Sequence, residues 1–299
     1  MTGPHSGPPT AAALPTTRGA APVLRLVPFA FTQAFGRPPA GVWSAPYVLR
    51  RTGSRAGAGS AVALSWRVVV AAAPRADGRL RLGSIDRPDE GVEVDPRGDI
   101  GPVPEWARPV LAGTTGAGGL DLLVHTDLPE CTGLSAAVPL ACTAALIEAA
   151  FHDPEPGDAR RSRIRLSDPP LGAVALFARL GHVMVFGEDS GAPNHVPFDP
   201  DGLGLRFVLA VPRRAGAAAS GPTTRQIAGS IAEPARNARA AGAIEARPLP
   251  GADGPTIAVV PGAALAAVRR ALVHTYTRAG EPAPRVLSAA LGSPCARAA

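Results

Sequence analysis

The chain has 299 residues and a formal net charge of +6, with 46% hydrophobic and 18% charged residues, which is the composition of a folded globular protein. All 30 basic residues are arginine, so kinases and ATPases that depend on a lysine are excluded. Aromatic residues make up only 4% of the chain, too few for a single-strand nucleic-acid binder that stacks bases. Because the arginines are also scattered, we expect no nucleic-acid partner.

The N-terminal segment, the cysteines and the longest apolar stretch all bear on where the protein is located. Residues 1–22 are mostly small residues and proline, which predicts a disordered leader rather than a signal peptide. The three cysteines, Cys131, Cys142 and Cys295, are far apart and form no disulfide framework. The apolar stretch 134–151 is mostly alanine and contains a proline and a glutamate, so it predicts a buried helix. We therefore expect a cytoplasmic protein that does not engage a membrane.

The first half of the chain carries mainly strand signals. After an apolar segment at 23–35 comes a Gly/Pro-rich stretch at 36–46. Short runs rich in valine, leucine and alanine then predict half-buried or buried strands. These predicted strands lie at 61–72, 80–82, 92–94 and 121–125. A short helix is predicted near Trp106, and a turn at 127–133 leads into a helix that ends near residue 150.

The second half alternates helix and strand signals around two interruptions. A polar, arginine-rich loop is predicted at 151–170 and an Ala/Gly/Ser linker at 213–222. The predicted helices lie at 172–180, 227–243 and 263–279, and the predicted strands at 182–186, 205–211, 256–260 and 286–290. The closing strand–helix–strand unit predicts a ferredoxin-like sandwich. The fold class is therefore α+β, with domains at 23–170 and 171–299.

The most informative segment is 121–140, in which a strand, a Gly/Ser turn and the start of a helix follow one another. Free backbone N–H groups and the helix dipole favour a phosphate at such a corner without any lysine. Many corners of this kind bind nothing, so the pattern alone leaves an anion site and a purely structural turn both open.

This segment resembles the phosphate loop of the GHMP kinases, and of galactokinases in particular, which reads PxGxGLSSSAAL. The matching residues are Pro129, Gly133, Leu134, Ser135 and Leu140. Further similarity follows in order at 66–84, 176–186 and 257–297, so that the resemblance spans about residues 23 to 297. It implies a GHMP-kinase-like two-domain fold, with a strand-rich N-terminal domain that carries the phosphate loop and a ferredoxin-like C-terminal domain.

The resemblance also implies ATP-dependent phosphorylation of a sugar hydroxyl, which is C1 of galactose in the family. The cofactors would be ATP and Mg²⁺, and the partners a small sugar and ATP. Gly133, Leu134 and Ser135 would bind the phosphates, and Ser135 would also contact the metal.

The remaining roles fall on three residues outside the phosphate loop. Arg37 would stabilise the transferring charge, and Tyr47 would contact the substrate. The family's catalytic aspartate falls at Leu171, and the nearest carboxylate is Asp168, three residues earlier. Asp168 is therefore the candidate base, with a solvated loop aspartate as the alternative interpretation.

Several positions depart from the family pattern. The glutamate, histidine and aspartate that hold the sugar correspond to Trp43, Ser44 and Pro46. In the phosphate loop, two serines are replaced by Ala136 and Ala137. A polyol held by carboxylates cannot be held in the same way by the tryptophan, serine and proline that stand at these positions.

Two functions therefore stay open, a galactokinase-like sugar kinase and a catalytically inactive GHMP pseudokinase that binds a metabolite or acts in regulation. A metal cluster of His125, Asp127, Glu130 and Cys131 is a weaker hypothesis, because its spacing fits no common zinc pattern. We therefore prefer the interpretation of these four side chains as a turn of ordinary polar residues.

Overall fold

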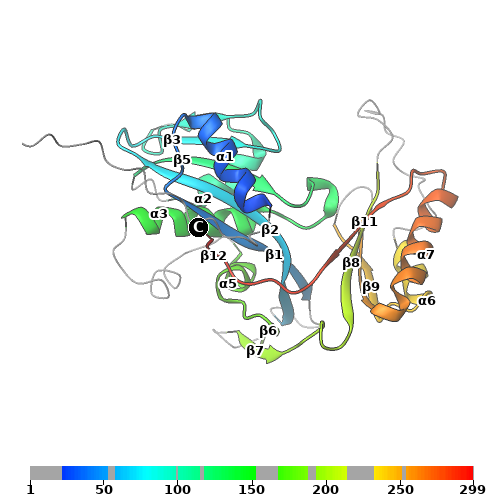
Figure 1. The fold of residues 1–299 in the computed structure, drawn as a ribbon. Coiled ribbons are helices and arrows are strands. Elements are labelled where there is room, and N and C mark those ends of the chain that lie inside the picture. The colour runs from blue at the N-terminus through cyan, green and yellow to red at the C-terminus, as the bar shows by residue number, and fades with distance from the viewer. Residues whose placement is uncertain are drawn as a thin grey trace, which may run out of the picture.

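The computed structural model describes residues 22–52, 58–98, 100–114, 118–152, 168–187, 193–213, 232–250 and 254–298. The predicted leader and most of the predicted loop at 151–170 and linker at 213–222 lie outside these residues. The described residues form two β-sheets, each covered by helices (Figure 1). None of the described helices is long and apolar enough to cross a membrane.

The first sheet contains eight strands among the described residues. Six follow the order β12-β1-β2-β5-β3-β4, while β6 pairs with β2 and β7 pairs with β6. Their bounds are β1 (Gly41–Thr52), β2 (Gly59–Arg75), β3 (Leu80–Ser84), β4 (Val92–Val94), β5 (Gly119–Thr126), β6 (His182–Phe186), β7 (Asn194–Pro197) and β12 (Ala296–Arg297). The β3–β5 pair is parallel, and the other described pairs are antiparallel.

Helices lie on both faces of the first sheet (Figure 1). On one face, α1 (Val23–Phe35) buries Val27 and Phe31 against β2 and β5. The other face forms the main core with the short η1 (Glu105–Ala107), α2 (Arg108–Gly113), α3 (Ala137–His152) and α5 (Pro169–Phe177). β5 is buried on both faces, and a strand of this kind is mostly apolar. This is the sequence pattern from which the strand is predicted.

The second sheet has the order β11-β8-β10-β9, with α6 and α7 on one face. Its elements are β8 (Leu205–Val211), α6 (Glu233–Ala240), β9 (Glu245–Pro248), β10 (Thr256–Pro261), the short η3 (Gly262–Ala264), α7 (Leu265–Arg278) and β11 (Arg285–Ala289). This βαββαβ order confirms the predicted ferredoxin-like sandwich. Val208 and Val260 face the helices, whereas Phe207 and Ile257 join the core of the first sheet.

The two sheets do not divide the chain at residue 171, where the sequence predicts the boundary. α5 packs against β1 and β2, and β6 and β7 extend the first sheet. The second sheet begins only at Leu205, and the chain returns to the first sheet as β12. The physical reason is burial, because Val174 and Met184 complete an apolar cluster with Ala61 and Ala63 of β2.

The Gly/Pro-rich stretch at 36–46 holds a strand that its composition does not predict. Gly36 ends α1 with φ 70°, and β1 begins at Gly41. Pro46 is accommodated beside a register shift between Pro46 and Val48, where β1 and β2 lose regular pairing. The predicted helices and the other predicted strands correspond to observed elements, although the helix predicted at 227–243 is described only as α6.

A buried carboxylate holds the start of β5 in place. The side chain of Asp121 is 2% exposed and accepts from three guanidinium groups, with N–O distances of 2.7 Å to Arg37, 3.0 Å to Arg75 and 2.9 Å to Arg81. Burial alone would raise the pKa of Asp121, but the hydrogen bonds outweigh it and lower the pKa. Arg81 also lies 4.5 Å from the ring centroid of Phe35, which ties α1 to the sheet.

Asp121→Ala should destabilise the protein strongly, because it leaves three clustered cations without their shared partner. We expect a loss of about 3–5 kcal/mol in the free energy of unfolding at pH 7, measured by chemical denaturation. Since the pKa of Asp121 is lowered on folding, its contribution is present above about pH 4 and is lost as the pH falls further. Asp77→Ala removes an exposed partner of Arg75 and is the control. Equal losses in the two variants would contradict this role.

Candidate functional site

The candidate site lies where β5 ends and the chain turns into α3. After Thr126 the chain passes through a 3₁₀ turn, η2 (Glu130–Thr132), and reaches Gly133, which has φ 70°. A Cβ at Gly133 would lie 2.2 Å from the carbonyl oxygen of Pro250, two residues after the end of β9. Glycine is therefore required twice, for the left-handed backbone and for the close approach to the second sheet. The predicted turn and helix are both confirmed.

The start of α3 presents unpaired backbone donors. The Ser135 hydroxyl accepts a hydrogen bond from the N–H of Ala137 at 3.1 Å, and Pro139 in the first turn has no N–H to satisfy. The N–H groups of Ser135 and Ala136 have no acceptor among the described residues. With 16 residues of aligned peptide dipoles behind it, this end of α3 favours an anion.

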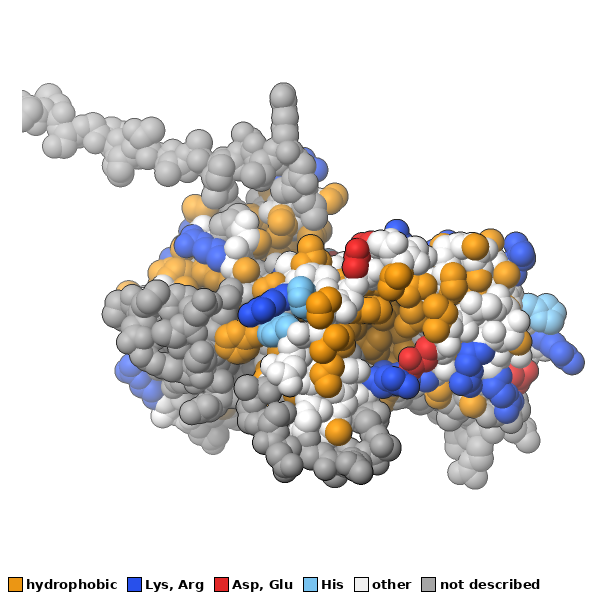
Figure 2. Space-filling model, turned by 90° about the horizontal axis from the view of Figure 1, so that it is seen from below, with side chains coloured by type: hydrophobic (Ala, Val, Ile, Leu, Met, Phe, Trp, Pro, Cys, Tyr) orange, Lys and Arg blue, Asp and Glu red, His pale blue; other side chains and the backbone are white. Residues whose placement is uncertain are grey.

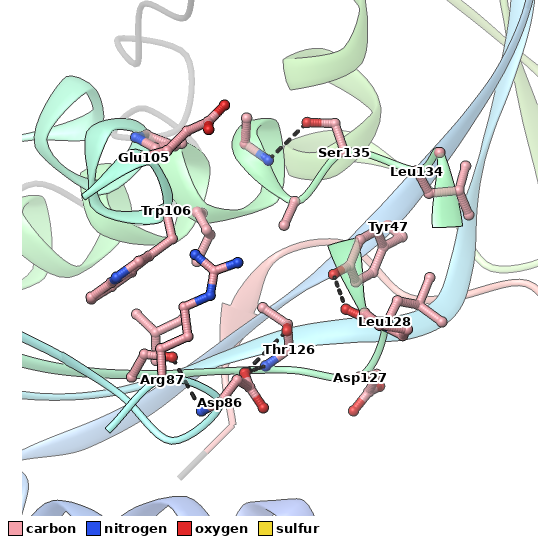
Figure 3. Close-up of a pocket in the computed structure, with 18 of the residues that line it drawn as sticks. Tyr47, Asp86, Arg87, Glu105, Trp106, Thr126, Asp127, Leu128, Leu134 and Ser135 are labelled. Carbon is pink, nitrogen blue, oxygen red and sulfur yellow. Dashed lines mark hydrogen bonds between the residues drawn. The ribbon is translucent and has the colours of Figure 1, made fainter. Parts of the chain in front are cut away.

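A cavity of about 740 Å³ opens in front of this helix end. Its walls come from β1, the segment after β3, η1, the loop after β5 and the first residue of β11. In Figure 3, Arg87 points into the cavity beside the Trp106 ring, and Ser135 and Tyr47 lie on other walls. Arg285 of the second sheet also lines the cavity, so two cations face a space that begins at a helix N-terminus.

The aromatic walls are fixed by burial. Tyr47 is 1% exposed, and its hydroxyl donates to the carbonyl of Leu128 at 3.5 Å. Trp106 is 8% exposed and packs in the main core. Both rings therefore form preset walls rather than side chains that must be ordered by a ligand.

A carboxylate joins the ends of β3 and β5 at the edge of the cavity. Asp86 accepts from the N–H of Thr126 at 2.8 Å, from its hydroxyl at 3.1 Å and contacts Nδ1 of His125 at 3.0 Å. The hydrogen bond to Asp86 raises the pKa of His125, against the effect of burial. Burial would raise the pKa of Asp86, but His125 and Thr126 outweigh it and lower that pKa.

Asp86→Asn should lower the pKa of His125 toward its ordinary value, because the variant removes the negative charge that holds the imidazolium. In the wild type this charged pair contributes stability below about pH 6.5, and the contribution is lost as the pH rises through the raised pKa of His125. Titration of the His125 ring by NMR measures the effect, with the exposed His274 of α7 as internal control. A His125 titration unchanged by the substitution would refute the pairing.

The structure brings some of the sequence-predicted residues together and separates others. The predicted phosphate-loop residues, Gly133, Leu134 and Ser135, and the predicted substrate residue, Tyr47, all line the cavity.

Arg37 and Asp168 do not line this cavity. Arg37 donates to Asp121 and to the carbonyl of Pro74, toward the other end of β5. Asp168 is the N-cap of α5 and accepts from the N–H of Leu171 at 3.1 Å. The geometry of both residues is explained by structural contacts.

Two cavity residues, Arg87 and Arg285, are missed by the sequence analysis. Each is an ordinary arginine in a chain rich in arginine, and no local pattern marks it. In the part of the chain that the structure describes, no group of three or more histidine, cysteine or acidic side chains could bind a metal, and the side chain of Glu130 lies outside that part. Asp127 instead accepts from the N–H of Arg67 at 2.7 Å.

Proteins of known structure share the fold of this chain, although its sequence matches none of the known families. The sequence matches no protein-family model, and no curated protein is significantly similar to it. Among solved structures, galactokinase from Lactococcus lactis in complex with galactose superposes with a TM-score of 0.72 at 16% identity, over 92% of this chain and 100% of that chain. Mevalonate kinase from Methanococcus jannaschii gives 0.56 at 8% identity, over 84% and 98%. Homoserine kinase from Cytophaga hutchinsonii gives 0.51 at 13%, over 86% and 96%.

The fold is therefore that of small-molecule kinases. Its two sheets agree with the GHMP-kinase-like fold that the sequence predicts, with a strand-rich first unit and a ferredoxin-like second unit.

Proposed function

We propose that this protein binds ATP in the cavity at the start of α3 and acts as a pseudokinase, with little or no phosphoryl transfer to a sugar. The observation that carries the proposal is the pair of N–H groups without a described acceptor, on Ser135 and Ala136, two residues that line the cavity together with Arg87 and Arg285. Among the described residues these are the donors best placed for a chain of phosphates. The kinase fold supports the same ligand.

The residues present fit a nucleotide. Arg87 and Arg285 would pair with phosphate oxygens, and the Trp106 side of the cavity would cover the base. Mg²⁺, which the fold family implies, neutralises phosphate charge when it is bound and takes oxygen ligands. The Ser135 hydroxyl would be its protein ligand, together with the phosphates. Asp86 and Asp127 also line the cavity, but both carboxylates already accept hydrogen bonds from neighbouring residues.

The positions that bind sugar in the resembled family support the loss of sugar phosphorylation. Trp43 is 3% exposed and packs edge-on against Phe151, with ring centroids 5.6 Å apart. The hydroxyl of Ser44 accepts from Nε of Arg67 at 3.0 Å, and Pro46 lies at the irregular point of β1. These side chains are used in the fold of the first sheet and offer no set of polar groups to a polyol.

The candidate base supports the same conclusion. Asp168 is occupied as the cap of α5 and does not line the ATP cavity. General base catalysis contributes about 10²–10⁴-fold in rate, so its loss leaves turnover slow. The alternative, an active galactokinase-like enzyme, is favoured by the overall similarity to a galactokinase structure and keeps Arg37 and Asp168 as catalytic groups.

Arg87→Ala should weaken ATP binding at least about tenfold, because one charge-assisted contact to phosphate is lost. Titration of the full chain with ATP and Mg²⁺ by isothermal calorimetry measures the affinity. Arg97→Ala is the matched control, since Arg97 is exposed and does not line the cavity. No ATP binding by the wild type at millimolar nucleotide would overturn the proposal.

Incubation with ATP, Mg²⁺ and galactose should release ADP no faster than incubation without the sugar. Asp168→Asn keeps the helix cap but removes the carboxylate, and we expect it to behave as the wild type does. Galactose-dependent ADP release that disappears in Asp168→Asn would instead establish the active kinase. Comparison with Arg37→Gln would then show whether Arg37 contributes to turnover.

A further inference from the structure

A second, smaller cavity of about 280 Å³ lies between the two sheets. One side is formed by the paired end of β1 and β2 together with β6, and the other by β8, β9 and β10. Figure 2 shows an apolar hollow on the face seen from below, bordered by basic and acidic side chains. None of the residues that line this second cavity lines the ATP cavity, so the two sites are separate.

The walls of this second cavity are mainly apolar. The side chains that form them are Leu49, Val62, Val183, Phe198, Phe207 and Ile257. They belong to the face of the second sheet opposite to α6 and α7, and to the part of the first sheet that faces it. Such a lining favours an apolar ligand body, because its burial removes hydrocarbon surface from water on both sides.

The charged groups of the cavity come from both of its walls, Arg51 from β1 and Glu245 and Arg247 from β9. Arg247 of β9 is half-buried, and its guanidinium donates to the carbonyl of Arg50. No carboxylate of the described residues lies within ion-pair distance of Arg247, because Glu245 pairs with Arg51 instead, at 3.5 Å. The pKa of Arg247 is lowered, mainly by burial and also by the nearby charge of Arg51, and the opposite effect of Glu245 does not outweigh them. The positive charge of Arg247 is therefore only partly balanced by its surroundings.

We propose that this second cavity binds a small amphipathic carboxylate, with the hydrocarbon body between the sheets and the carboxylate on Arg247. A carboxylate matches the guanidinium in charge and geometry and would complete the hydrogen bonding of a half-buried cation. Arg51, which is 72% exposed, lies at the rim, where Glu245 balances its charge, so the net charge of the three charged residues favours a single negative group. The volume corresponds to about ten water-sized groups. A straight-chain acid with eight carbons has this size.

Octanoate, 1-octanol and octylammonium form a matched set of probes for wild-type protein, because they share the chain and differ in head-group charge. We expect saturable binding of one octanoate per chain by calorimetry, with octanol at least about tenfold weaker and octylammonium not bound. Equal affinities for octanoate and octanol would overturn the role of Arg247. The absence of saturable octanoate binding would overturn the site itself.

Two variants test whether octanoate binds in the second cavity and whether its carboxylate contacts Arg247. Arg247→Gln should reduce octanoate affinity to that of octanol and leave octanol binding unchanged, which also reports that the variant is folded. Arg278→Gln, on the exposed side of α7, is the control. Ser60→Trp should fill the second cavity and abolish binding of both octanoate and octanol, while the affinity for ATP stays as in the wild type. Octanoate affinity that is unchanged in Arg247→Gln or in Ser60→Trp would contradict the proposal, whatever the result of the ATP titration.

Discussion

The close contact between Gly133 and the carbonyl of Pro250 is the constraint on which the ATP cavity depends. The loop after β5 must leave the first sheet, touch the segment between β9 and β10 and enter α3 within about ten residues, and a side chain at Gly133 would collide with that segment. The contact fixes where α3 begins and therefore where its open N–H groups point. It also brings Arg285 of β11 to the same cavity as Arg87 of the first sheet. The anion site is thus a property of how the two sheets meet.

Arginine supplies much of the polar structure of this lysine-free chain. Arg67 donates to the hydroxyl and carbonyl of Ser44 and to the carbonyls of Ser293 and Pro294, at 3.0–3.2 Å, and so ties the C-terminal segment to β1 and β2. The planar guanidinium of arginine donates to several acceptors at once in fixed directions. The ammonium group of a lysine at the same position would donate with a less defined geometry. Burial lowers the pKa of Arg67, although the nearby Asp127 carboxylate acts against this effect. Like Arg67, Arg37 stabilises the fold, in its case through the ion pair with Asp121.

The sequence predicts the parts of this fold that rest on local patterns. β5 is predictable because a buried strand reads as an apolar run, and the ferredoxin-like unit because its helices and strands alternate at regular spacing. β1 is not predictable from composition, since its glycines and prolines are accommodated by pairing with β2 and by an irregular register at Pro46. β9 and β12 are too short to give a pattern; β9 is defined by its pairing with the next strand, β10, and β12 by its pairing with the distant β1.

The residues of the candidate site also differ in how far the sequence predicts their roles. Gly133 and Ser135 are predictable because the turn and the helix start are adjacent in the chain. The partner of Arg37 is 84 residues away, so no local pattern distinguishes a structural arginine from a catalytic one. Asp168 as a helix cap could have been found from the two prolines that follow it, since proline favours the first turn of a helix.

The most direct measurement of the central claim is a crystal structure of the full chain with a non-hydrolysable ATP analogue, Mg²⁺ and galactose. We expect the triphosphate at the start of α3, with phosphate oxygens on the N–H groups of Ser135 and Ala136 and on Arg87, and no ordered sugar beside Trp43 and Ser44. A galactose molecule held next to the terminal phosphate, with Asp168 turned toward its hydroxyl, would show instead that the protein is an active kinase.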